Sequence, residues 1–99
     1  MPPIPLAGEL TIYRVTEFWT LLRAALPPGR ADQRPVVLDL RNVTEFDGAG
    51  LQLLLTLARW ATDQGSTLEL SAAPGFVLSM LEAFGVTGRF KLIAENPGP

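Results

Sequence analysis

The strongest constraint on the fold of this chain is a strand-to-helix transition within residues 36–55. Val36–Leu40 is apolar except for Asp39, a pattern typical of a central strand that is covered on both faces. A polar turn then leads to Asp47 and to the small-residue step Gly48–Gly50, after which leucines recur at helical spacing. A buried strand followed at once by an amphipathic helix indicates an α/β layer structure.

The other predicted elements follow from the period of the apolar residues. Two short strands around Gly8 are expected to form a hairpin or a bulged pair. Pro27 and the residues after it are expected to end the first helix and begin a polar connection over 27–35. In chain order, the pattern predicts strands at residues 4–7 and 9–13, a helix at 15–26, a strand at 36–40, a helix at 51–61, a strand at 67–71, a helix at 74–84 and a strand at 89–94.

This order, β-β-α-β-α-β-α-β, predicts a single α/β domain over residues 1–99. We expect a mixed β-sheet of about five strands, packed with about three main helices. The length is that of one domain, and it suffices to bury a cooperative core. Residues 95–99 are expected to form a frayed tail.

The composition argues against several classes of function. The chain has no histidine and no cysteine, so it lacks the commonest general base, the commonest metal ligand and any thiol nucleophile. We therefore expect a non-enzymatic protein without cofactor or metal. The net charge of −2, with both signs interspersed, argues against nucleic-acid binding. No apolar run reaches the length of a membrane span, and the first residues do not resemble a secretory signal, so we expect a cytoplasmic protein.

The corner at Asp47 combines a capping residue with a step that has no hydroxyl group. We expect the Asp47 carboxylate to accept hydrogen bonds from N–H groups in the first turn of the following helix. Two interpretations of Gly48 and Gly50 remain open and are compatible. The glycines permit a tight turn with close helix–sheet packing, or they leave bare backbone at the positive end of a helix dipole as a contact surface for a partner.

These residues resemble the signature of the STAS family, the sulfate-transporter and anti-sigma-factor-antagonist domain. That signature runs Asp-Leu-x-x-Val-x-x-Ile-Asp-Ser-Ser-Gly-Leu, with Asp-Thr-Ala-Gly-Leu in a large branch. The matching residues here are Asp39, Leu40, Val43, Asp47, Gly50 and Leu51. The resemblance extends over essentially the whole chain, including the order of the elements. It implies a STAS-like fold and a role in protein–protein interaction.

The resemblance also locates a regulatory position that this chain has lost. In antagonists of anti-sigma kinases, the second hydroxyl residue of Asp-Ser-Ser-Gly is phosphorylated to release the partner. That position is Ala49 here, and the preceding position is Gly48. The nearest hydroxyl, on Thr44, lies on the other side of the cap. We therefore expect no phosphorylation switch at this step.

The second helix presents an apolar arc wider than one core contact requires. We expect Leu51, Leu54, Leu55 and Ala58 to face the sheet. The flanking apolar residues, Leu53, Leu57 and Trp60, are either covered by neighbouring helices or partly exposed for a partner. STAS domains bind partners through this helix and the loop before it, so the predicted partner-binding residues are Asp47, Gly48, Ala49, Gly50, Gln52, Leu53, Thr56, Leu57 and Trp60.

Other aromatic side chains are interpreted as core. Phe18 and Trp19 lie on the predicted first helix. Phe76, Met80 and Phe84 recur every four residues, which predicts a buried seam on the third helix.

Two functions are compatible with the resemblance. The first is a regulatory adaptor, similar to an anti-sigma-factor antagonist or a chemotaxis-linked STAS protein, that binds a histidine kinase or another signalling partner. The second is a STAS subunit attached constitutively to the ATPase of a lipid-transport ABC complex. The missing hydroxyls at Gly48 and Ala49 favour constitutive binding in either setting. The sequence predicts neither the partner nor the oligomeric state.

Overall fold

A computed structural model of the chain describes residues 3–26 and 34–94. The helix stop predicted at Pro27 and the tail predicted at 95–99 lie outside these residues. In chain order, the elements are β1 (Ile4–Pro5), β2 (Gly8–Leu10), α1 (Val15–Ala25), β3 (Val36–Asp39), β4 (Val43–Phe46), α2 (Gly48–Asp63), β5 (Leu68–Ser71), α3 (Gly75–Ala83), the short 3-10 helix η1 (Thr87–Arg89) and β6 (Lys91–Ile93). The predicted α/β class with three main helices is confirmed.

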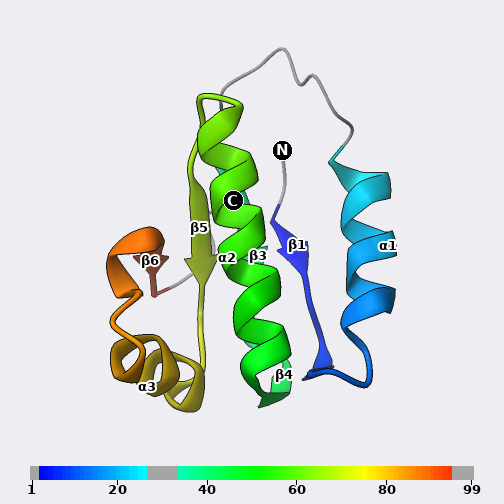
Figure 1. The fold of residues 1–99 in the computed structure, drawn as a ribbon, viewed down its shortest axis with the longest axis vertical. Coiled ribbons are helices and arrows are strands. Elements are labelled where there is room, and N and C mark those ends of the chain that lie inside the picture. The colour runs from blue at the N-terminus through cyan, green and yellow to red at the C-terminus, as the bar shows by residue number, and fades with distance from the viewer. Residues whose placement is uncertain (1–2, 27–33, 95–99) are drawn as a thin grey trace.

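Four strands form the main sheet in the order β1-β3-β5-β6 (Figure 1). The central register pairs Leu38 of β3 with Ile4 on one side and with Leu70 on the other. A mixed sheet is predicted from the sequence, whereas every ladder among the described strands runs parallel. The reason is that each ladder joins strands separated by a helical crossover, and such crossovers return the chain in the same direction.

A second, two-stranded sheet pairs β2 with β4. The hairpin predicted around Gly8 is therefore wrong, because β1 and β2 pair with different strands. Gly8 has a φ of +89°, and the register shifts by a bulge between Gly8 and Glu9. Strand β4 is missing from the predicted elements because Thr44 and Glu45 are exposed and give the segment the polarity of a turn.

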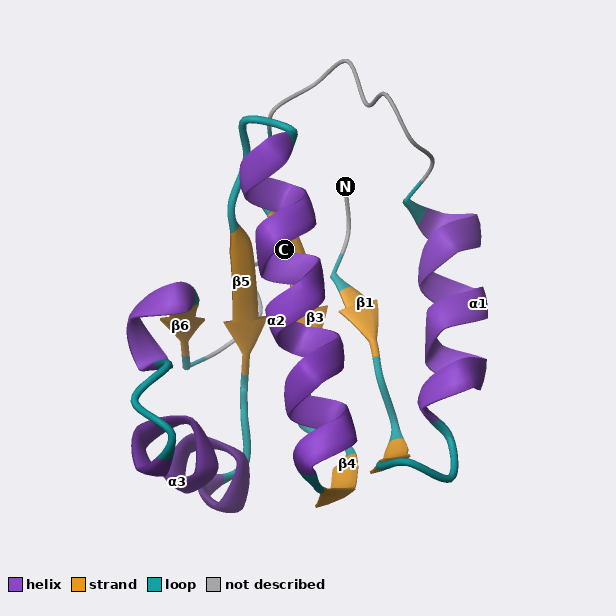
Figure 2. Cartoon of the chain, in the orientation of Figure 1, coloured by secondary structure: helices purple, strands orange, loops and turns teal. Residues whose placement is uncertain are grey.

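Helices α1 and α2 are neighbours, and α2 also contacts β4 and β5 (Figure 2). The core between the helices and the sheet is built mostly from leucines. Those that are almost fully buried are Leu6, Leu10, Leu22, Leu38, Leu40, Leu53, Leu54, Leu70 and Leu81. Within the described residues, no helix is both long enough and apolar enough to cross a membrane.

Helix α3 presents a different face to the core from the one predicted. Val77 and Leu81 are fully buried, whereas Phe76 is 46% exposed and Phe84 is 64% exposed. The predicted buried seam of Phe76, Met80 and Phe84 is therefore wrong. The helix ends as predicted, with Gly85 at a φ of +68°, a conformation common just after a helix C-terminus.

Asp39 lies at the end of β3, where its charge is satisfied locally. Its carboxylate accepts hydrogen bonds from the backbone N–H of Arg41 at 3.0 Å and from Arg41 Nε at 3.2 Å. This agrees with the physical requirement that a carboxylate largely removed from water has partners.

Candidate partner-binding site

Asp47 joins three segments through its carboxylate. Oδ1 accepts from the backbone N–H groups of Ala49 at 2.9 Å and Gly50 at 3.1 Å, which caps the first turn of α2 as predicted. Oδ2 accepts from the N–H of Ile12 at 3.1 Å, in the loop between β2 and α1. One side chain therefore fixes the position of this loop against the start of α2.

The same three donors stabilise the ionised form of Asp47. The N–H of Ile12 makes the largest contribution, and those of Gly50 and Ala49 add to it. Partial desolvation acts in the opposite direction but is outweighed, so the pKa of Asp47 is lowered below its ordinary value. The carboxylate is consequently ionised at neutral pH, when it accepts all three hydrogen bonds.

Gly50 is required by the close approach of α2 to β2. A Cβ atom at this position would lie 2.2 Å from the carbonyl oxygen of Leu10 and 3.0 Å from Cδ1 of Phe46. The first of these atoms belongs to the backbone and cannot move without shifting the strand. Of the two interpretations of the glycines, the structural one therefore applies to Gly50, which is buried.

Gly48 is exposed and has open space around it. No heavy atom lies within 4 Å of the position that a Cβ would take. Ala49 is partly buried, and neither residue has a hydroxyl group. The corner thus presents backbone to solvent at the first turn of α2, and this matches the second interpretation of the glycines at Gly48.

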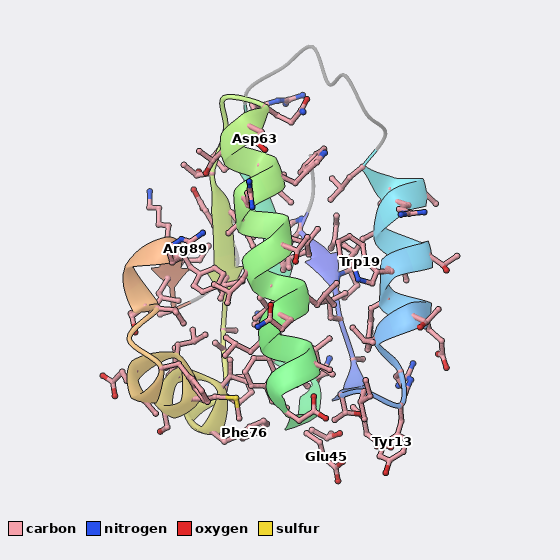
Figure 3. The ribbon with its side chains drawn as sticks, viewed as in Figure 1. Tyr13, Trp19, Glu45, Asp63, Phe76 and Arg89 are labelled. Atoms are coloured by element: carbon pink, nitrogen blue, oxygen red, sulfur yellow. The ribbon has the colours of Figure 1, made fainter. Side chains whose placement is uncertain are left out.

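The loop held by Asp47 exposes two large apolar side chains beside the corner. Ile12 is 63% exposed and Tyr13 is 85% exposed. Figure 3 shows Tyr13 and Glu45 at the same end of the molecule, which is also the end where α2 begins. Ile12 and Tyr13 are not among the predicted site residues, because Thr-Ile-Tyr is typical of a strand. The second carboxylate oxygen of Asp47, which the cap does not use, is the sequence feature that could have indicated a contact with another segment.

The predicted partner-binding residues on α2 separate into exposed and buried groups. Gln52 and Thr56 are exposed, and Trp60 is partly buried. Leu53 and Leu57 are only 1% and 4% exposed, so the prediction that they contact a partner directly is corrected. Both side chains belong to the hydrophobic core, and Leu57 lies beside residues of α1.

No group of three or more metal-ligating side chains occurs within the ranges 3–26 and 34–94. What the corner presents to solvent is the backbone at Gly48 and the side chains of Ile12 and Tyr13.

Comparison with known families identifies the family of the chain. The chain matches the family model described as "Mlab, STAS domain" over residues 2–94. Comparison with curated proteins gives no match. STAS domains generally act as non-enzymatic protein-interaction modules of the anti-sigma-factor-antagonist type. Because the match covers nearly all of the chain, this protein belongs to the STAS domain family.

Proposed function

We propose that this protein is a single-domain, cytoplasmic adaptor that binds a signalling protein in the manner of a bacterial anti-sigma-factor antagonist. The observation that supports this most is the corner at the start of α2. There, exposed backbone at Gly48 lies next to a loop whose Ile12 and Tyr13 side chains face solvent. Gln52 and Thr56 extend the exposed surface along the helix.

The binding is constitutive rather than switched by phosphorylation at the corner. A phosphate placed here would add roughly 1.5 to 2 negative charges at a helix start. Gly48 and Ala49 have no side-chain hydroxyl to accept it. Asp47 also caps α2 without a phosphate, since the Asp47 carboxylate already accepts three backbone hydrogen bonds.

The experiment that tests this proposal is affinity capture from a lysate of the source cells, followed by identification of bound proteins. The variant Gly48→Arg places a large charged side chain at the corner, where the Cβ atom has no heavy atom within 4 Å. Gly88→Arg is the matched control, because Gly88 is also exposed and also has no heavy atom within 4 Å of a built Cβ. We expect the wild type and Gly88→Arg to capture the same partner and Gly48→Arg to lose it. Equal capture by all three proteins would exclude the corner from the interface.

A second candidate function is a subunit bound permanently to the ATPase of a lipid-transport ABC complex. The lack of hydroxyl groups at Gly48 and Ala49 favours it, because a permanent subunit needs no release signal. The same capture experiment separates the two functions. A histidine kinase or an anti-sigma-type kinase supports the adaptor, and an ABC ATPase with its permease supports the transport subunit.

A further inference from the structure

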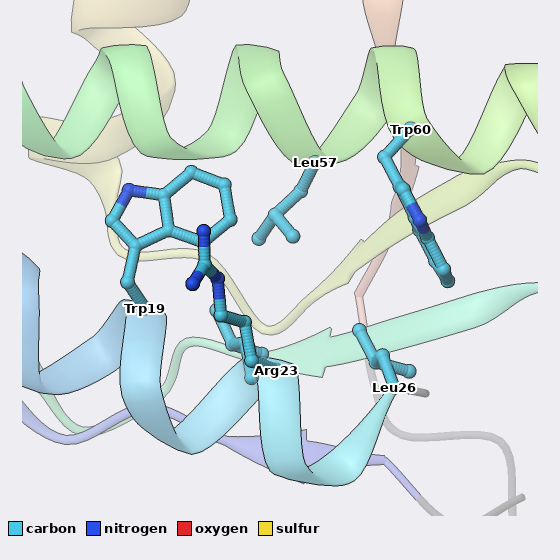
Figure 4. Close-up of a pocket in the computed structure, with 6 residues that line it drawn as sticks. Trp19, Arg23, Leu26, Leu57 and Trp60 are labelled. Carbon is cyan, nitrogen blue, oxygen red and sulfur yellow. The ribbon is translucent and has the colours of Figure 1, made fainter. Parts of the chain in front are cut away.

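A groove between α1 and α2 lies outside the proposed partner-binding corner. It has a volume of about 410 Å³, within the range of small-molecule sites in proteins. Figure 4 shows Trp19 and Arg23 from α1 and Leu57 and Trp60 from α2 bordering the same space. The side chains that line the groove are Trp19, Leu22, Arg23, Leu26, Leu57 and Trp60.

The lining is apolar with one charged group. Leu22, Leu26 and Leu57 are buried and belong to the core, so they form a fixed apolar floor. Trp19 and Trp60 are partly buried and pack against that core. Each therefore keeps part of its indole accessible to a ligand. Such a surface favours a ligand with an apolar body.

Arg23 determines the charge that such a ligand would have. It is exposed in the last turn of α1, and no ion pair or hydrogen bond joins it to another described residue. Among the described residues that line the groove, none carries a carboxylate. Tryptophan pairs also bind quaternary ammonium ions, but a guanidinium without a neighbouring carboxylate repels a cation. A guanidinium instead pairs well with a carboxylate, through two parallel hydrogen bonds.

We propose that this groove binds an apolar monocarboxylate, with its apolar body against the tryptophans and leucines and its carboxylate on Arg23. The proposal does not depend on the identity of the protein partner or on the corner at Asp47. It adds a small-molecule site to a chain whose family acts through protein contacts.

The tryptophans make the groove directly observable. The chain has two tryptophans, Trp19 and Trp60, and both line this groove. The intrinsic tryptophan fluorescence of the whole protein therefore reports on the groove. We suggest titration with octanoate, with octan-1-ol and octyltrimethylammonium as probes that have the same chain but no charge or a positive charge. Isothermal calorimetry with octanoate supplies the stoichiometry.

We expect octanoate to change the fluorescence saturably at one site per chain, and the alcohol and the cation to bind at least about tenfold more weakly. Arg23→Gln should weaken octanoate binding by about tenfold or more. Arg59→Gln is the matched control, since Arg59 is exposed on α2 but does not line the groove, and it should bind octanoate like the wild type.

Several outcomes would overturn the proposal. They are the absence of a saturable signal, equal binding of octanoate and octan-1-ol, or equal loss of binding in Arg23→Gln and Arg59→Gln. If the wild type binds no octanoate, and if Arg23→Gln fails to capture the protein partner that the wild type captures, the groove is a protein-docking site instead. The variant Gly48→Arg distinguishes this failure from failure of the proposed function, because it alters the corner and leaves the groove unchanged.

Discussion

Gly48 and Gly50 lie two positions apart in the same helical turn but differ in what surrounds them. The carbonyl of Leu10 occupies the space that a side chain at Gly50 would need, whereas Gly48 faces open space. A sequence pattern identifies both as small residues at a helix start and does not separate these roles. The difference depends on β2, which reaches α2 only through the tertiary fold.

This difference predicts opposite effects of the same substitution. Gly50→Ala should destabilise the protein by about 1–3 kcal/mol, the usual range for overpacking in a tight site. Gly48→Ala should be neutral or stabilise by up to ~1 kcal/mol, because alanine favours the helix and meets no atom. Urea denaturation of the two variants measures both values. Equal stabilities would show that α2 does not approach β2 as closely as described.

The cap at Asp47 predicts a pH dependence with a definite sign. The pKa of Asp47 is lowered in the folded protein, chiefly by the N–H of Ile12. Its contribution to stability is therefore complete above the ordinary value of about 3.9 and is lost as the pH falls through the folded pKa. Asparagine is also a good N-cap but does not titrate. The stability difference between the wild type and Asp47→Asn should accordingly shrink as the pH falls below ~4.

Denaturation of both proteins between neutral and acidic pH measures this difference, with Asp47→Ala as a reference. Removal of the cap in Asp47→Ala should cost about 1 kcal/mol at neutral pH. A wild type and an Asp47→Asn variant that differ by the same amount at every pH would contradict an ionised Asp47 as the acceptor.

Among the secondary-structure elements, helix α3 shows where sequence periodicity fails. Phe76, Val77, Met80, Leu81 and Phe84 are all apolar, so two different stripes on this helix have core-like spacing. The structure buries the stripe of Val77 and Leu81. A nine-residue helix with apolar residues on most sides does not specify its own orientation, which is set instead by packing against the neighbouring elements.

The orientation of α3 predicts which substitutions on it are costly. Leu81→Ala should destabilise by about 2–5 kcal/mol, because Leu81 is fully buried. Phe84→Ala should cost less than about 1 kcal/mol, because most of its side chain faces solvent. Thermal or urea denaturation tests the pair. A larger loss in Phe84→Ala than in Leu81→Ala would restore the predicted seam.

At the scale of the whole molecule, helix α2 has two different surroundings along its length. Its N-terminal turn forms the corner with Asp47 and the exposed loop, and its C-terminal half forms the groove with α1.

The class of fold, the cap and the missing hydroxyls were predictable from local sequence. The exposed loop at Ile12 and the burial of Leu53 were not, because they depend on contacts between residues far apart in the chain.

Mass spectrometry of the protein isolated under native conditions from its own cells tests the central claim most directly. One spectrum reports both the mass of the chain and the mass of any complex that contains it. Constitutive binding predicts a complex with one protein partner and no phosphate on residues 44–56 of the chain, because Gly48 and Ala49 have no hydroxyl to accept one. A phosphate mapped to residues 44–56 on a chain that has no partner would contradict the account.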